Sequence, residues 1–184
     1  MLRKDAQGPG FGSTIEKSLE ERPIAPPVVV QMYTPEMWES VKDRLVQIQQ
    51  GVFKNDAYSE EGLKKFFDLP RAHTLLLRKY TDSGEIIGFT TAFAERDHPD
   101  IAHIPITAIV TDLQGLRLVG QMMERLEELL RFNGFSFISR RIFLDNPWMQ
   151  TVQKHYGDRI VEARKIVSRV FGPERPQMYF KIRL

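Results

Sequence analysis

The chain has 184 residues, of which 42% are hydrophobic, and this is enough for one domain with a substantial core. Lysine and arginine (26) nearly balance aspartate and glutamate (24), and no long basic run stands out, so the net charge of +2 does not favour nucleic-acid binding. The lack of cysteine excludes disulfides, thiolate metal sites and a cysteine nucleophile.

The four histidines show no metal-ligand spacing, so we expect no metal site. No apolar run is long enough to cross a membrane, and the first residues contain no apolar signal segment. A cytoplasmic location without a membrane partner is therefore expected.

Residues 1–26 are rich in glycine, proline and charge, and they lack apolar periodicity apart from a helical turn around Ile15–Glu21. We expect an extended arm that contacts a protein partner or a second copy of the chain, because such arms become ordered by packing on something. The domain itself is expected over 27–184.

The first predicted elements are a strand over 27–33 and two helices. Thr34, Pro35 and an acidic residue give a strong helix start, and the helix is expected to end at Gly51. A second, short helix is expected from Ser59 to the break at Pro70. The apolar stripe of the first helix is Met37, Val41, Leu45 and Ile48.

Two strands are predicted over 73–80 and 85–93, joined by a hairpin turn at 81–84. Gly88 interrupts the second of them, which indicates a bulge or a close backbone approach.

The next unit is an apolar strand over 104–110, a short turn and an amphipathic helix over 115–133 that stops at Gly134. Pro105 removes one hydrogen-bond donor from the strand, so a neighbouring strand must be absent or splayed there. A strand–loop–helix unit is a natural phosphate site, because the first amides of the helix are unpaired. It can equally be a plain structural unit.

After Gly134 the pattern predicts a strand over 135–145, a short helix opened by Asn146-Pro147, and two closing strands over 159–171 and 177–184. The pair Arg140-Arg141 is interpreted as a solvated strand end.

This order of elements resembles the GNAT family of acyl-CoA-dependent N-acyltransferases over roughly residues 27–184. The resemblance implies a mixed, mostly antiparallel α/β sheet of about six or seven strands with about four helices, in which strands 104–110 and 135–143 are parallel and splayed. It also implies acetyl-CoA as co-substrate and an amine acceptor, with the loop 51–58 beside the acceptor site.

In that family the fourth strand binds the pantetheine arm of CoA, and a Q/R-x-x-G-x-G/A loop cradles the pyrophosphate. Gln114 matches the first position, but Arg117 and Val119 stand where the family has glycines. Either Arg117 supplies charge to the phosphates, or a Thr111-x-x-Gln114 capping box starts the helix early and closes the loop. The implied cofactor-binding residues are Ile109, Val110, Gln114, Gly115, Leu116, Arg117, Leu118, Val119, Gly120 and Asn146.

For catalysis the resemblance suggests His103 as general base, because it lies near the position of the glutamate in histone-acetyltransferase-type members, and a histidine titrates near neutrality. It can also be an ordinary strand histidine. Tyr156 is the candidate general acid, although it comes a turn later than the family's tyrosine. Weaker candidates for the base are Glu95, Asp97 and His98.

The resemblance leaves two functions open. The first expectation is an acetyl-CoA-dependent N-acetyltransferase acting on an unidentified amine. Alternatively, the chain is a GNAT-fold protein with lost or weakened catalysis that serves as a structural or interaction component through its N-terminal arm, for example in a phage assembly.

Overall fold

The computed structural model describes residues 25–168 and 175–184. The N-terminal arm falls almost wholly outside these residues, so its contacts and its partner stay predictions. Among the residues described, no helix is long and apolar enough to cross a membrane. The same residues contain no group of three or more metal-ligating side chains.

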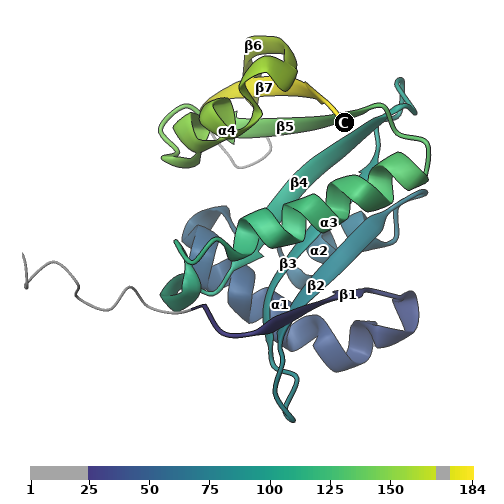
Figure 1. Cartoon of the computed structure of the whole chain (residues 1–184), viewed down its shortest axis with the longest axis vertical. Helices are drawn as coiled ribbons and strands as arrows, with labels where there is room; N and C mark the ends of the chain where they lie inside the picture. Colours follow the sequence, from purple (N-terminus) through teal and green to yellow (C-terminus); the bar gives the residue numbers. More distant parts are fainter. Residues whose placement is uncertain (1–24, 169–174) are drawn as a thin grey trace, which may run out of the picture.

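The described strands form one seven-stranded sheet in the order β1-β2-β3-β4-β5-β7-β6. Every neighbouring pair is antiparallel except β4 and β5, which are parallel (Figure 1). This confirms the predicted mixed, mostly antiparallel sheet. The strands are β1 (Val28–Met32), β2 (His73–Lys79), β3 (Ile86–Ala94), β4 (Ile101–Ile109), β5 (Phe137–Phe143), β6 (Ile160–Ser168) and β7 (Arg175–Arg183).

Four α-helices cover the two faces of this sheet, as far as the described residues go: α1 (Trp38–Phe53), α2 (Glu60–Phe67), α3 (Leu118–Phe132) and α4 (Trp148–Tyr156). The buried side chains of α1 and α2 form one core cluster with β2, β3 and β4. Those of α3 and α4 form a second cluster on the opposite face. The two faces of the sheet are thus separately filled, and Figure 1 shows α3 in front of the sheet with α1 and α2 behind it.

The predicted helix starts are confirmed, with small differences. A 3-10 turn, Pro35–Met37, precedes α1, and the Ser59 hydroxyl accepts a hydrogen bond from the Gly62 amide at the start of α2 (3.1 Å). The prediction that α1 ends at Gly51 is wrong, because the helix continues to Phe53. Lys54 then ends it with a positive φ of 52°.

The parallel pair β4–β5 is short. Only Ile101–His103 pairs with Phe137–Ser139, and the two strands separate before Pro105. The β3–β4 pairing also shifts register nearby, between Thr91 and Phe93. A proline cannot donate to a neighbouring strand, so the predicted splay at Pro105 is confirmed.

Helix α3 crosses over between these parallel strands and buries Met122, Met123, Leu126 and Leu130, as its pattern predicts. It also buries a charge. The Glu127 carboxylate is paired with Arg131 one turn later (3.0 Å) and with Arg159 from the 3-10 turn before β6 (2.7 Å). Two cations from different elements therefore compensate one buried anion.

Gly88 lies in β3 opposite Ile109 of β4, where the two backbones approach closely. A Cβ built at this position would lie 2.8 Å from the Ala108 carbonyl oxygen and 2.8 Å from Ile109 Cγ1. The register of the β2–β3 pairing also shifts beside this residue. Gly88 is therefore required by both a close approach and an irregularity of the ladder.

We predict that Gly88→Ala destabilises the protein by about 1–3 kcal/mol, the usual cost of forcing atoms into a packed core. Urea denaturation would measure the change. Gly51→Ala is the matched control, because a Cβ there meets nothing within 4 Å. Because Gly51 is an exposed position of α1, this change should stabilise the protein by about 0.5–1 kcal/mol. A neutral or stabilising Gly88→Ala would contradict the close approach.

Candidate functional site

The segment between β4 and α3 is an open loop. A single 3-10 turn, Thr111–Leu113, follows the strand, and α3 begins only at Leu118. The early helix start through a Thr111–Gln114 capping box is therefore wrong. Gly115 (φ 84°) and Arg117 (φ 60°) both adopt left-handed backbone conformations, and they turn the chain into the helix.

The loop presents a run of unpaired amides. Within the described part of the chain, the backbone N–H groups of residues 115–120 donate to no acceptor, and the first helical bond in this region is from Gln121 to the Arg117 carbonyl. Consecutive free amides next to left-handed residues form an anion-binding concavity, and the positive end of the helix dipole adds to it. This arrangement fits a phosphate group.

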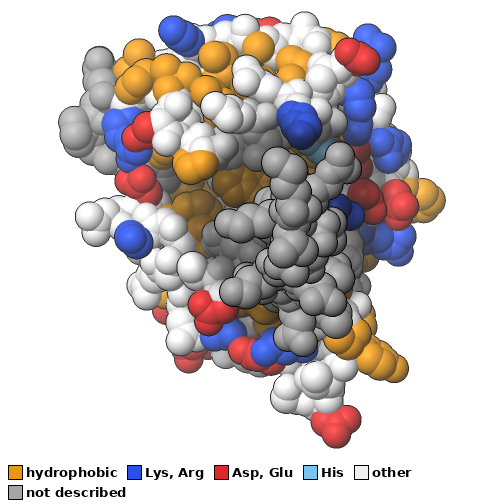
Figure 2. Space-filling model, turned by 60° about the vertical axis from the view of Figure 1, so that its left-hand side comes forward, with side chains coloured by type: hydrophobic (Ala, Val, Ile, Leu, Met, Phe, Trp, Pro, Cys, Tyr) orange, Lys and Arg blue, Asp and Glu red, His pale blue; other side chains and the backbone are white. Residues whose placement is uncertain are grey.

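A cleft of about 410 Å³ opens beside this loop, between the start of α3 and α4. In Figure 2, where the left-hand side of Figure 1 is turned forward, apolar side chains are visible in a recess at mid-height. The lining residues are Ile109, Leu113, Gln114, Gly115, Arg117, Leu118, Val119, Gly120, Met123, Arg140, Trp148, Thr151, Val152, His155 and Tyr156. We call this the donor cleft.

Most of the predicted cofactor-binding residues line the donor cleft. Val110 and Leu116 do not: Val110 packs against both core clusters, and Leu116 packs against the cluster on the α3 face. Asn146 lies at the start of α4, where its Oδ1 accepts from the Trp148 amide (2.9 Å). It caps the helix, and a role in cofactor binding stays a prediction.

Tyr156, the candidate acid, is 4% exposed and lines the cleft from the last turn of α4. Burial is the main cause that raises the pKa of its hydroxyl to about 12. At neutral pH the hydroxyl therefore keeps its proton and can serve as a donor.

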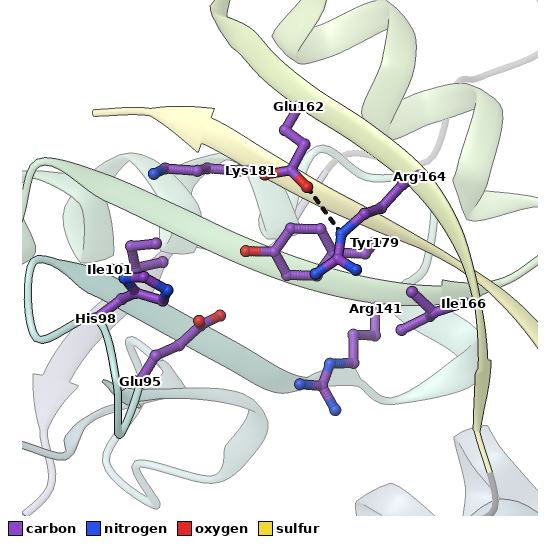
Figure 3. A pocket seen from close by; sticks show the side chains of 9 residues that line it. All are labelled: Glu95, His98, Ile101, Arg141, Glu162, Arg164, Ile166, Tyr179 and Lys181. Atoms are coloured by element: carbon purple, nitrogen blue, oxygen red, sulfur yellow. Dashed lines mark ion pairs between the residues drawn. The ribbon is translucent and has the colours of Figure 1, made fainter.

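A second pocket, of about 390 Å³, lies between the β3–β4 hairpin and the last two strands. We call it the acceptor pocket. Figure 3 shows Glu95 and Arg141 in the lower part of the view, the Tyr179 ring above them, and the Glu162–Arg164 ion pair (2.8 Å) at the top. Its other lining residues are His98, Ile101, Ile166 and Lys181.

A hydrogen-bonded chain connects this pocket to the point where β4 and β5 separate. The Ser139 hydroxyl donates to the Glu95 carboxylate and contacts His103 Nδ1 (2.9 Å). Ser139 and His103 are the last paired residues of the two strands. The structure thus connects His103, through Ser139, to Glu95 of the acceptor pocket. Tyr156 lies on the other side of the sheet.

The His103 imidazole is not poised near neutrality. Burial, with smaller contributions from Arg141 and Arg140, lowers its pKa to about 3. A general base works best when its pKa is close to the working pH, so the neutral ring is suited to orienting Ser139 rather than to carrying the proton.

The interpretation of Arg140-Arg141 as a solvated strand end is wrong for its first member. Arg141 is exposed in the acceptor pocket, whereas Arg140 is 7% exposed and lines the donor cleft. The signal was in the sequence: Arg140 lies two residues from both Ile138 and Ile142, and alternate residues of a strand share a face. No comparable sequence pattern marked Tyr179 or Ser139 as a residue of the candidate site.

The buried His103 predicts an acid-sensitive fold. The unfolded chain binds a proton at the ordinary histidine pKa of 6.5, whereas the folded protein does not until about 3. Stability is therefore lost as the pH falls from 6.5, by about 1 kcal/mol per pH unit for this residue. Urea denaturation from pH 7 to 4 should show a flatter dependence for His103→Gln. Exposed His98→Gln is the control, and an equal flattening there would contradict the assignment.

No family model and no curated protein sequence matches this chain. Solved structures do. The ribosomal-protein-S18-alanine N-acetyltransferase from Escherichia coli has a TM-score of 0.65 at 14% identity, covering 85% of this chain and 93% of its own. NAA60 from Arabidopsis thaliana, in complex with a bisubstrate analogue, has a TM-score of 0.65 at 13% identity, covering 85% and 99%.

A third match is a chain of the NatC complex bound to Gag peptide and CoA, with a TM-score of 0.63 at 14% identity and coverage of 86% and 99%. A further match is described as an acetyltransferase of the GNAT family. These similarities extend over nearly the whole length of each matched chain. The protein therefore has the fold of the GNAT N-acetyltransferases.

Proposed function

We propose that the protein is an acyl-CoA-dependent N-acyltransferase that transfers an acyl group from a CoA thioester to an amine. The observation that carries the proposal is the run of free amides 115–120, which opens onto the donor cleft beside the splayed strands. A chain of similar fold from the NatC complex, solved bound to Gag peptide and CoA, supports it. CoA would supply an activated acyl group, and the residues of this chain would bind, orient and exchange protons.

The loop fits CoA phosphates in spite of its side chains at the family's glycine positions. The left-handed conformation of Arg117 lets the chain turn into α3, which is the task a glycine would otherwise perform. Its side chain is exposed at the mouth of the cleft, where a guanidinium can pair with phosphate oxygens. The loop thereby combines backbone donors with one exposed cation.

The acceptor amine would approach from the opposite face, through the acceptor pocket. Glu95 is the group best placed to take the amine proton, since it lies in that pocket and is held by Ser139, which in turn contacts His103. In the reaction a nitrogen–carbon bond forms and the carbon–sulfur bond of the thioester breaks. Tyr156, on the donor side, would give its proton to the departing sulfur.

CoA binding is the first test. We predict that CoA raises the thermal midpoint, because a ligand of the native state stabilises it by mass action. Arg117→Ala should weaken CoA binding by about 1–3 kcal/mol, the range for a lost charge-assisted hydrogen bond. Arg125→Ala is the matched control, since Arg125 is exposed on α3 and paired with Glu128. Calorimetry at millimolar CoA that shows no heat and no shift in midpoint would defeat the proposal.

Catalysis is the second test. We predict that Glu95→Gln lowers the turnover rate by about 10²–10⁴-fold, the usual contribution of a general base, and leaves the affinity for CoA unchanged. Release of free thiol from acetyl-CoA with a panel of amines and peptides would measure it. A Glu95→Gln enzyme with full activity would remove this residue from the mechanism, and a parallel loss of CoA affinity would indicate a structural role instead.

A further inference from the structure

Arg140 is a buried cation that forms no ion pair with any residue that the structure describes. Its side chain reaches across the gap between β5 and β4, where Nη2 donates to Thr107 Oγ1 (3.0 Å) and to Met123 Sδ (3.1 Å). Its Nε is buried and has no acceptor. Among the residues described, no carboxylate lies within ion-pair distance of Arg140.

The neighbouring acid compensates Arg140 only at a distance. Glu127 attracts the Arg140 guanidinium electrostatically, but its direct ion pairs are with Arg131 and Arg159. Tyr156 lines the same cleft as a neutral hydroxyl. A guanidinium remains protonated in proteins, and burying it without a paired anion is unfavourable. The cleft thus carries a positive charge that the described chain leaves without a direct ion pair.

Arg140 lies away from the end of the cleft that is formed by the free amides 115–120. Thr107, the residue on β4 that Arg140 contacts, precedes the loop by four residues, which is roughly 13 Å of strand. It lies toward the closed end of the gap, where β4 and β5 come together at His103 and Ser139. A donor with its phosphates on the free amides 115–120 would direct its acyl end to this place.

We propose that Arg140 binds the terminal carboxylate of an acyl group, so that the preferred donor is the CoA thioester of a short dicarboxylic acid rather than acetyl-CoA. The inference rests on the proposed function. The carboxylate provides the direct ion pair that Arg140 lacks, and a planar guanidinium matches a carboxylate in shape. The Thr107 hydroxyl and the apolar walls of the cleft would hold the arginine side chain in position.

Calorimetry with CoA, acetyl-CoA and succinyl-CoA tests this without relying on turnover. The wild type should bind succinyl-CoA about ten- to a hundredfold more tightly than acetyl-CoA, the range for a hydrogen-bonded charge pair. Arg140→Met should abolish that preference, and Arg140→Lys, which retains the charge, should keep part of it. Arg125→Met makes the same change on the exposed face of α3 and should keep the full preference.

Each outcome decides the proposal. Equal affinity of the wild type for the two thioesters would overturn it while leaving the proposed function intact, provided that CoA binds. An equal loss of affinity for all three ligands in Arg140→Met would also overturn it, because it would place Arg140 on CoA itself. Binding of none of them to the wild type would defeat the proposed function and this inference together. Circular dichroism checks folding, and if Arg140→Met does not fold, the wild type and Arg140→Lys decide.

Discussion

The arrangement of this protein depends on a failure of strand pairing. β4 and β5 are held together by only three residue pairs, and Pro105 then withholds the donor that the next step of the ladder would need. An unpaired backbone inside a sheet must find other partners. Here the strands diverge instead, and the Arg140 side chain reaches across the gap from β5 to Thr107 on β4. The donor cleft and the acceptor pocket lie on the two sides of this one interruption.

Successive polar side chains of β5 face alternately toward the acceptor pocket and the donor cleft. Ser139 and Arg141 face the acceptor pocket, while Arg140 between them faces the donor cleft. Adjacent residues of a strand point to opposite faces, so a run of three can serve two binding sites at once. The acceptor pocket carries charges of both signs, whereas the donor cleft is lined mainly by apolar residues together with the cations Arg117 and Arg140. The two substrates of a transfer reaction would thus meet different electrostatic environments.

Much of the fold could be predicted because its signals are local. Each signal determines the structure only of residues close to it in the sequence. Examples are the caps at Thr34 and Ser59, the hairpin turn before β3, Pro105 and the apolar stripe of α3. The candidate site depends on distant contacts. Glu95 and Ser139 are 44 residues apart, and the pKa of His103 reflects a burial that no sequence window records. The conformation of the loop at Arg117 also could not be predicted, since a left-handed non-glycine residue is decided by its surroundings.

Glu127 has a consequence for how the chain assembles. Its carboxylate is buried between α3 and the start of β6, and one of its two cations, Arg159, comes from a segment 32 residues further along the chain. Until that segment docks, α3 cannot bury Glu127 without leaving the anion half-compensated, which is costly in a low-dielectric interior. Closure of the second core and docking of the C-terminal strands are therefore coupled into one cooperative step. This buried ion pair makes the two halves of the sheet on either side of the gap interdependent in folding, even though so few backbone hydrogen bonds join them.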